Sequence, residues 1–167
     1  MINDILISRT DYWEEMRKHF QIIATSGGFD PLHIGHLRSI LDMRKAVIEI
    51  DPHTQTYLHT VVIVNGPNFL KQKKGYEFMP LEERMEIILN IKGVDEVVTW
   101  DQEGNDSSIS EALKIIRPHF FCKGGDRTQA KGIAEEPLCK EIGCKIIWNV
   151  GGGKIQSSST LVNAINK

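Results

Sequence analysis

The chain has 167 residues, of which 41% are hydrophobic, and a formal net charge of −2. This length fits one ordinary domain with a sizeable core. The charge excludes a global basic field of the kind that attracts nucleic acid, and no apolar run is long enough to cross a bilayer. The first residues lack the pattern of a signal peptide, and three cysteines cannot all pair. We therefore expect a cytoplasmic protein with reduced thiols and with neither nucleic-acid nor membrane partners.

Apolar runs rich in β-branched residues alternate with helical patterns along the chain. Strands are predicted at 20–26, 58–65, 95–100, 119–123 and 144–150. Helices are predicted at 36–48, 80–91, from a capping box at 108–111 to before 118, at 134–142, and at 158–166 with Ser158 as the cap. The alternation predicts an α/β, Rossmann-like open parallel sheet of about five strands with helices on both faces. Residues 1–20 form an N-terminal extension, with a candidate helix at 11–19, ahead of a main domain at 21–167.

The run from Gly27 to His36 joins the first predicted strand to the first long helix. A helix N-terminus offers unpaired N–H groups and partial positive charge, which together suit a phosphate. His33 and His36 are three residues apart and therefore share one helical face. Gly35 between them leaves the backbone bare where a phosphate must come close. This turn therefore predicts a nucleotide site.

Three further polar loops follow predicted strands, at 65–66, 123–126 and 151–159. Ligands of open parallel sheets bind at the carboxyl ends of the strands, near the point where the strand order reverses. We expect these loops and the turn at 27–36 to meet at one edge of the sheet.

At these residues the chain resembles the nucleotidyltransferase superfamily with the HxGH signature, and within it the cytidylyltransferase-like family. Gly27–His36 is similar to the first motif of that family. Residues 71–76 and 81–84 resemble the lysine loop and ER motif of glycerol-3-phosphate cytidylyltransferases. Residues 123–126 resemble the KGGD segment of the heptose-1-phosphate adenylyltransferase domain of ADP-heptose synthases. Residues 157–160 stand at the serine/threonine motif, and 94–98 at a VDEV-type strand.

The resemblance implies transfer of a nucleoside monophosphate from ATP or CTP to a small phosphorylated acceptor, with release of pyrophosphate. His33 and His36 would donate to the phosphates, and Lys71 and Lys73 would hold the reacting phosphates from a mobile loop. The resemblance also implies Mg²⁺ with the triphosphate, for which Asp30 is the candidate carboxylate, and a homodimer. Asn65 and Arg84 are expected near the acceptor. The expected nucleotide-binding residues are Gly27, Gly28, Phe29, Asp30, Gly35, Lys123, Gly124, Asp126, Ser157, Ser158, Ser159 and Thr160.

Several of these residues also have a purely structural interpretation. Asp30 could cap the turn before Pro31 instead of binding a metal. Arg84 could form an ion pair with Glu82 or a neighbouring acid, and Lys74 is expected in solvent. A zinc site among Cys122, Cys139, Cys144 and His119 is rejected, because no ligand pair has the required spacing.

Departures from the family pattern leave the base and the acceptor open. Gly28 stands where the glycerol-phosphate enzymes have threonine, Arg127 where they have tryptophan, and the stretch 151–156 lacks their arginine. Asn163 stands where other adenylyltransferases have arginine. An adenylyltransferase for a sugar phosphate is favoured over a glycerol-3-phosphate-type cytidylyltransferase. The alternatives from other classes are a class I aminoacyl-tRNA synthetase, for which the chain is too short, and a nucleotide sensor without turnover.

Overall fold

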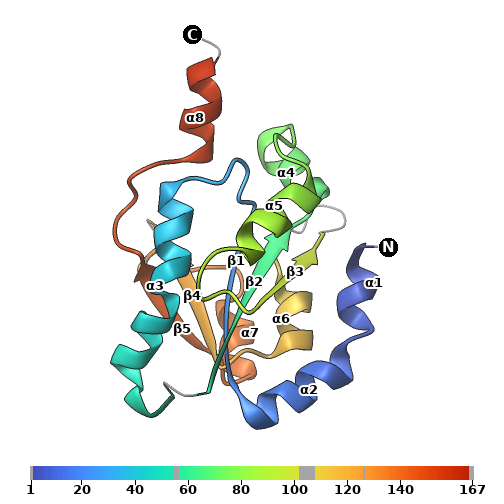
Figure 1. The fold of residues 1–167 in the computed structure, drawn as a ribbon, viewed down its shortest axis with the longest axis vertical. Coiled ribbons are helices and arrows are strands. Elements are labelled where there is room, and N and C mark those ends of the chain that lie inside the picture. Colours follow the sequence, from blue (N-terminus) through green and yellow to red (C-terminus); the bar gives the residue numbers. More distant parts are fainter. Residues whose placement is uncertain (1, 55–56, 102–107, 126, 166–167) are drawn as a thin grey trace.

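The computed structural model describes residues 2–54, 57–101, 108–125 and 127–165. Its centre is a five-stranded sheet in the order β3-β2-β1-β4-β5, in which every neighbouring pair is parallel (Figure 1). The strands are β1 (Gln21–Gly27), β2 (Leu58–Asn65), β3 (Glu96–Trp100), β4 (Phe120–Gly124) and β5 (Lys145–Val150). The predicted α/β class and all five predicted strands are confirmed.

Eight α-helices and one short 3-10 helix accompany the sheet in the described part of the chain. They are α1 (Ile2–Ile7), α2 (Thr10–His19), α3 (Ile34–Ile50), the 3-10 turn Pro52–Thr54, α4 (Pro67–Lys74), α5 (Leu81–Leu89), α6 (Ser110–Ile116), α7 (Glu136–Glu141) and α8 (Ser158–Ile165). Each of these helices is too short or too polar to cross a bilayer. In Figure 1, α8 extends away from the sheet beyond the N-terminal end of α3.

Alternate residues of each strand pack on opposite faces of the sheet, because side chains alternate with period two. On β1, Ile22 and Ala24 join a core cluster with α1, α2, α6 and α7, whereas Ile23 joins a cluster with α3. On β2, Ile63 lies on the first face and Val62 lies on the opposite face, where α5 packs. The predicted arrangement of helices on both faces is therefore confirmed.

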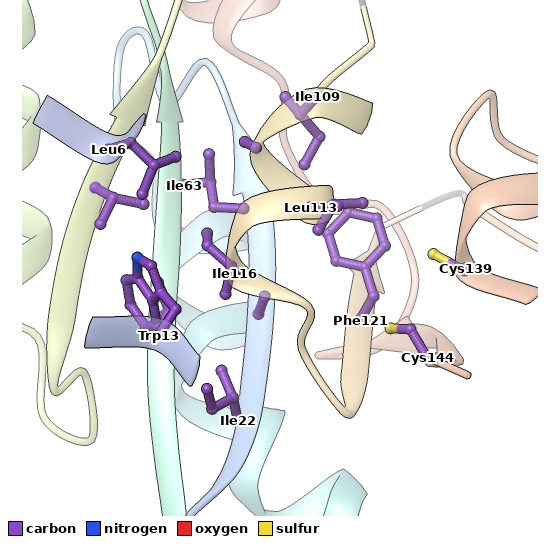
Figure 2. Packing of buried hydrophobic residues seen from close by; sticks show 14 of the residues in the cluster. Leu6, Trp13, Ile22, Ile63, Ile109, Leu113, Ile116, Phe121, Cys139 and Cys144 are labelled. Atoms are coloured by element: carbon purple, nitrogen blue, oxygen red, sulfur yellow. The ribbon is translucent and has the colours of Figure 1, made fainter. Parts of the chain in front are cut away.

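The N-terminal extension is part of the main core. Leu6 of α1 and Trp13 of α2 pack beside Ile22, Ile63 and Ile116, as Figure 2 shows, and the Trp13 side chain has no exposed surface. The predicted helix at 11–19 is confirmed as α2. The extension thus covers sheet surface that would otherwise face water.

Two predicted helix caps are wrong. The N-cap of α6 is Ile109, without a side-chain cap, and its N–H donates to Glu135 at 3.3 Å. Of the expected capping box at 108–111, the Ser108 hydroxyl accepts from the Ser110 N–H at 3.5 Å, whereas a distant carboxylate accepts from the N-cap residue. At α8, Ser157 rather than Ser158 caps the helix, since the Ser157 hydroxyl accepts from the Thr160 N–H at 3.1 Å. The predicted end of α8 at residue 166 lies outside the described residues.

The prediction of a loop for the lysine segment is also wrong, because residues 67–74 form helix α4. Pro67 occupies the first turn, where its missing N–H costs nothing. Gly75 ends the helix in a left-handed conformation at φ 83°, and its N–H donates to the Lys71 carbonyl at 2.8 Å. The lysines therefore sit on a helix with a defined end.

Removal of the buried Trp13 ring should destabilise the whole domain. We expect Trp13→Ala to lower the free energy of unfolding by about 3–5 kcal/mol, the range for large aromatic side chains in a core. Ile5→Ala is the matched control from the same extension, because the Ile5 side chain is 67% exposed. Urea unfolding monitored by circular dichroism measures both variants. An unchanged midpoint for Trp13→Ala would contradict the packing of the extension in the core.

Candidate active site

An open cavity of roughly 1140 Å³ lies at the carboxyl ends of the strands. Its walls come from the turn after β1, from Asn65 at the end of β2, from the end of β4 and the loop after it, and from the stretch after β5. These are the four loops that were predicted to meet, so their convergence at one edge of the sheet is confirmed. The strand order reverses at β1, which pairs with β2 on one side and with β4 on the other. The cavity spans this switch point between β1 and β4.

His33 and His36 are stacked on one another inside this cavity. Their ring centroids are 3.7 Å apart with an interplanar angle of 19°, and the Phe29 ring meets His36 edge-on at 5.1 Å. His33 is the N-cap of α3, and its Nδ1 atom accepts from the Gly35 N–H at 3.1 Å. This bond places the ring proton of neutral His33 on Nε2, which makes Nε2 a donor.

Both imidazoles are neutral at physiological pH. Burial, the adjacent His33 ring and Lys74 together lower the pKa of His36 to about 3. Burial also lowers the pKa of His33, with smaller effects from Lys74 and Lys154. The positive charge of the site therefore resides on lysine and arginine side chains, and the histidines act as neutral hydrogen-bonding groups.

The glycines of the turn provide space for close packing. A Cβ atom at Gly28 would lie 2.7 Å from the Leu70 side chain of α4, and one at Gly35 would lie 3.0 Å from the His33 ring. The left-handed residue of this turn is Phe29, at φ 51°, rather than a glycine. Gly35 therefore makes room for the His33 ring that its own N–H orients.

The sequence left two roles open for Asp30, a structural role in the turn and a role as a magnesium ligand. The contacts of its side chain are those of the structural role. Its side chain is fully buried, and its carboxylate accepts from the N–H groups of Phe78 and Met79 at 2.8 and 2.6 Å. Lys74 donates to the Asp30 carbonyl at 2.5 Å. Asp30 is not among the cavity-lining residues. The Asp30 carboxylate thus holds the backbone before α5, and its role as a magnesium ligand stays a prediction.

Arg84 is not among the residues that line the cavity. This fully buried guanidinium donates to the carbonyls of Gly28 and Asn65, both at 2.8 Å, to Met79 O at 3.0 Å, and pairs with Glu77 at 2.7 Å. The side chain thus joins the ends of β1 and β2, and the expected ion pair with a neighbouring acid is confirmed with Glu77. Its contact with the acceptor stays a prediction. Asn65 does line the cavity, and its buried Oδ1 has no hydrogen-bond partner among the described residues.

The lysines of α4 divide between the cavity and its outside. Lys73 and Lys74 line the cavity, and burial lowers the pKa of both ammonium groups. The exposed Lys71 does not line it. The expectation that Lys74 faces solvent is therefore wrong, and the prediction for Lys71 as a site residue loses its geometric basis.

The remaining predicted residues lie mostly on the cavity wall. Lys123 and Gly124 line it, and the Lys123 ammonium lies 4.6 Å above the Phe121 ring and donates to the Ser26 hydroxyl at 3.4 Å. Ser157, Ser158 and Ser159 line it as well. Thr160 does not line it, and its N–H donates to the Ser157 hydroxyl in the first turn of α8. Asp126 lies outside the described residues.

Sequence reasoning missed several cavity residues, among them Glu135. Among the described residues, six lysine and arginine side chains line the cavity. A single carboxylate lines it, that of Glu135. The cations are Lys73, Lys74, Lys123, Arg127, Lys131 and Lys154. Such an excess of positive charge suits a ligand, or a pair of ligands, with several negative charges. Within the described chain no three histidine, cysteine or acidic side chains cluster as metal ligands, and the three cysteines are free thiols.

The model of the cytidylyltransferase-like family matches residues 24–162. The chain belongs to this family. The match begins within β1 and ends within α8, and it includes all the residues that line the cavity.

Curated relatives share the name bifunctional protein HldE. The chain is 30% identical to that of Methylococcus capsulatus over 128 residues, which cover 75% of this chain and 24% of the relative. It is 28% identical to that of Aliarcobacter butzleri over 136 residues, which cover 79% and 25% respectively. The chain thus matches about a quarter of the length of these relatives. The fold is shared with a lipopolysaccharide core biosynthesis protein from Thermoplasma volcanium, at a TM-score of 0.55 and 19% identity, over 77% of this chain and 94% of that one.

The low pKa of His36 predicts that its ring remains uncharged in mildly acidic solution. In ¹H–¹⁵N NMR spectra, the His36 ring signals should not titrate between about pH 5 and 8, whereas in urea every histidine should titrate near the ordinary value of about 6.5. Since the unfolded ring binds a proton more readily, its contribution to stability is full above about pH 6.5 and is lost as the pH falls toward 3. His36→Gln should therefore lose less stability than the wild type between about pH 7 and pH 5. A titration of the folded His36 ring near pH 6.5 would contradict this environment.

Proposed function

We propose that the chain transfers a nucleoside monophosphate from ATP or CTP to a small phosphorylated acceptor, with a sugar phosphate as the favoured acceptor class. A phosphate oxygen of the acceptor attacks the α-phosphorus of the triphosphate. The new phosphorus–oxygen bond forms as the bond to the bridging oxygen breaks, and pyrophosphate leaves. The acceptor phosphate is already ionised at neutral pH, so no residue has to act as a nucleophile.

The observation that carries this proposal is the neutral His33–His36 stack at the N-terminus of α3, inside a cation-lined cavity. Phosphoryl and nucleotidyl transfer depend on positioning and on stabilisation of charge that develops on phosphate oxygens. The Nε2–H of His33 is a preorganised donor, because the Gly35 N–H fixes its tautomer. The N-terminal end of the α3 helix dipole adds partial positive charge on the same side.

The charge of the cavity matches the two proposed ligands. A nucleoside triphosphate and a phosphate monoester together bring several negative charges, and the six cations of the cavity exceed its one described carboxylate. Lys73 and Lys74 approach from α4, whereas Lys123 at the end of β4 and Arg127 after it approach from the other side of β1. The cations therefore surround the place where two phosphate groups have to meet despite their mutual repulsion.

Mg²⁺ fits this site as a companion of the triphosphate. Magnesium in such sites is held by phosphate oxygens and water with few protein ligands. That arrangement agrees with a described cavity wall that offers one carboxylate, Glu135, whose Oε1 already accepts from the Ile109 N–H. The metal would neutralise phosphate charge, while the residues of the chain orient the two ligands.

The sugar-phosphate acceptor is supported by two observations. The Lys123–Gly124–Gly125 segment resembles that of heptose-phosphate adenylyltransferases, and it lines the cavity. The curated relatives are named bifunctional protein HldE, although the match covers about a quarter of their length. The second candidate remains a glycerol-3-phosphate-type cytidylyltransferase, which the lysine segment at 71–76 favours.

A pyrophosphate-release screen tests the proposal. Each of ATP, CTP, GTP and UTP is combined with sugar 1-phosphates, glycerol 3-phosphate and nucleotide monophosphates in the presence of Mg²⁺. We expect release with one nucleotide and with sugar 1-phosphates most strongly. Nucleotide binding in calorimetry without pyrophosphate from any acceptor would instead favour the nucleotide sensor.

Loss of the His36 ring should slow turnover far more than it weakens binding. We expect His36→Ala to lower kcat by roughly 10²–10³-fold, the scale for one preorganised donor to developing charge. Circular dichroism confirms that the variant folds, and steady-state kinetics measures the effect. Turnover within a few-fold of wild type in a folded variant would refute the assigned role.

The two neighbouring lysines of α4 provide an internal comparison. Lys73 lines the cavity and Lys71 does not, so Lys73→Ala should lower kcat/KM by at least about tenfold, the scale of about 1.4 kcal/mol of lost transition-state stabilisation. Lys71→Ala should change kcat/KM by less than about threefold. Steady-state kinetics of both variants, measured side by side, decides whether the helix presents Lys73 to the substrates. Equal losses in the two variants would contradict that assignment.

A further inference from the structure

The helix that carries Lys73 and Lys74 receives its N-terminal cap from a distant residue. The N-cap of α4 is Gly66, which has no side chain. The N–H groups of Asn68 and Phe69 donate instead to Oδ1 of Asp101, at 3.0 and 3.4 Å. A carboxylate 33 residues further along the chain, directly after β3, thus satisfies the first turn of α4.

Close contact between the two segments makes this remote cap possible. A Cβ atom at Gly66 would lie 2.4 Å from the Cβ and Cγ atoms of Asp101, and the Gly66 N–H donates to the Trp100 carbonyl at 2.9 Å. Any other residue at position 66 would displace the carboxylate. Gly66 has no side chain to cap the helix, and its missing side chain leaves the space that the Asp101 carboxylate occupies.

Asp101 is itself held by the N-terminal extension. The Asn3 side-chain amide donates to the Asp101 carbonyl at 2.8 Å, and the Asp101 N–H donates to the Asn3 Oδ1 at 2.8 Å. This pair of bonds fixes the Asp101 backbone in the same way that a neighbouring strand would. A continuous set of contacts thus runs from α1 through Asp101 to α4.

The length of α4 makes the cap important. Isolated helices of eight residues are unstable in water, so the position of α4 depends on its tertiary contacts. Phe69 and Leu70 supply the buried apolar contacts, and Asp101 places a carboxylate at the positive end of the helix dipole. The lysines lie at the opposite, negative end, where Lys73 and Lys74 reach the cavity.

We propose that Asp101, held by Asn3, is a positioning residue that fixes α4 and thereby places Lys73 and Lys74 in the cavity. Its effect on turnover rests on the proposed nucleotidyl transfer, whereas its effect on α4 does not. The N-terminal extension would then contribute to the site through Asn3, without touching a substrate.

The first test measures α4 directly and needs no activity. We expect Asp101→Ala to raise hydrogen exchange at the amides of residues 68–72 by about five- to tenfold, which corresponds to loss of one helix cap. Asp101→Asn retains a side-chain oxygen that can accept both bonds and should restore most of the protection. Asn3→Ala should give an intermediate increase and serves as a milder variant if Asp101→Ala does not fold.

Asp95→Ala is the matched control from the opposite end of β3. The Asp95 carboxylate also accepts a backbone bond, from the Thr60 N–H at 2.6 Å, and it pairs with Arg44, but it has no described contact with α4. Its loss should lower stability without a selective rise in exchange at 68–72.

The second test links the cap to the lysines by kinetics. Asp101→Ala should lower kcat about tenfold in the wild-type background and by a clearly smaller factor in the Lys73→Ala background, because the contribution of Lys73 is already absent there and only the placement of Lys74 can still be lost. Independent losses that multiply in the double variant would contradict positioning through α4, as would wild-type exchange at 68–72 in Asp101→Ala. Absence of pyrophosphate release in the wild type would overturn the proposed function, and the exchange measurement would still decide whether Asp101 fixes α4.

Discussion

The site depends on burial of two uncharged imidazoles at the N-terminus of α3. Stacking of His33 on His36, with Phe29 against the edge of His36, removes both rings from most solvent and lowers their pKa values. Neutral rings do not repel the surrounding lysines, so a strongly cationic cavity can form around them. The Gly35 N–H then selects the tautomer of His33, which leaves its Nε2–H available for a phosphate oxygen.

Around this pair, buried polar groups hold the loops in place instead of meeting the ligand. Arg84 connects the ends of β1 and β2, Asp30 connects the first turn to the start of α5, and Asp101 connects β3 to α4. Each of these side chains forms hydrogen bonds with backbone groups. The loops of the site therefore acquire fixed positions without secondary structure of their own, which agrees with a reaction that depends on positioning.

The strands and most helices could be predicted because their signals are local. β2 is a continuous β-branched run, and α3 follows a glycine-rich turn. Pro67 and Gly75 also mark both ends of α4, but the lysine pattern between them favours a loop, so the sequence does not predict this helix. Asp30, Arg84 and Asp101 could not be assigned from local patterns, because most of their partners lie 19 to 98 residues away. The role of Glu135 likewise depends on the folding of α7 beside α6.

The central claim is that the His33–His36 stack contacts the triphosphate. A crystal structure with a nucleotide analogue that cannot be cleaved between the α- and β-phosphates tests it most directly. The account predicts phosphate oxygens within hydrogen-bond distance of the His33 Nε2 atom, with Lys73 or Lys74 beside them. A nucleotide bound elsewhere, or one whose phosphates point away from both rings, would contradict it.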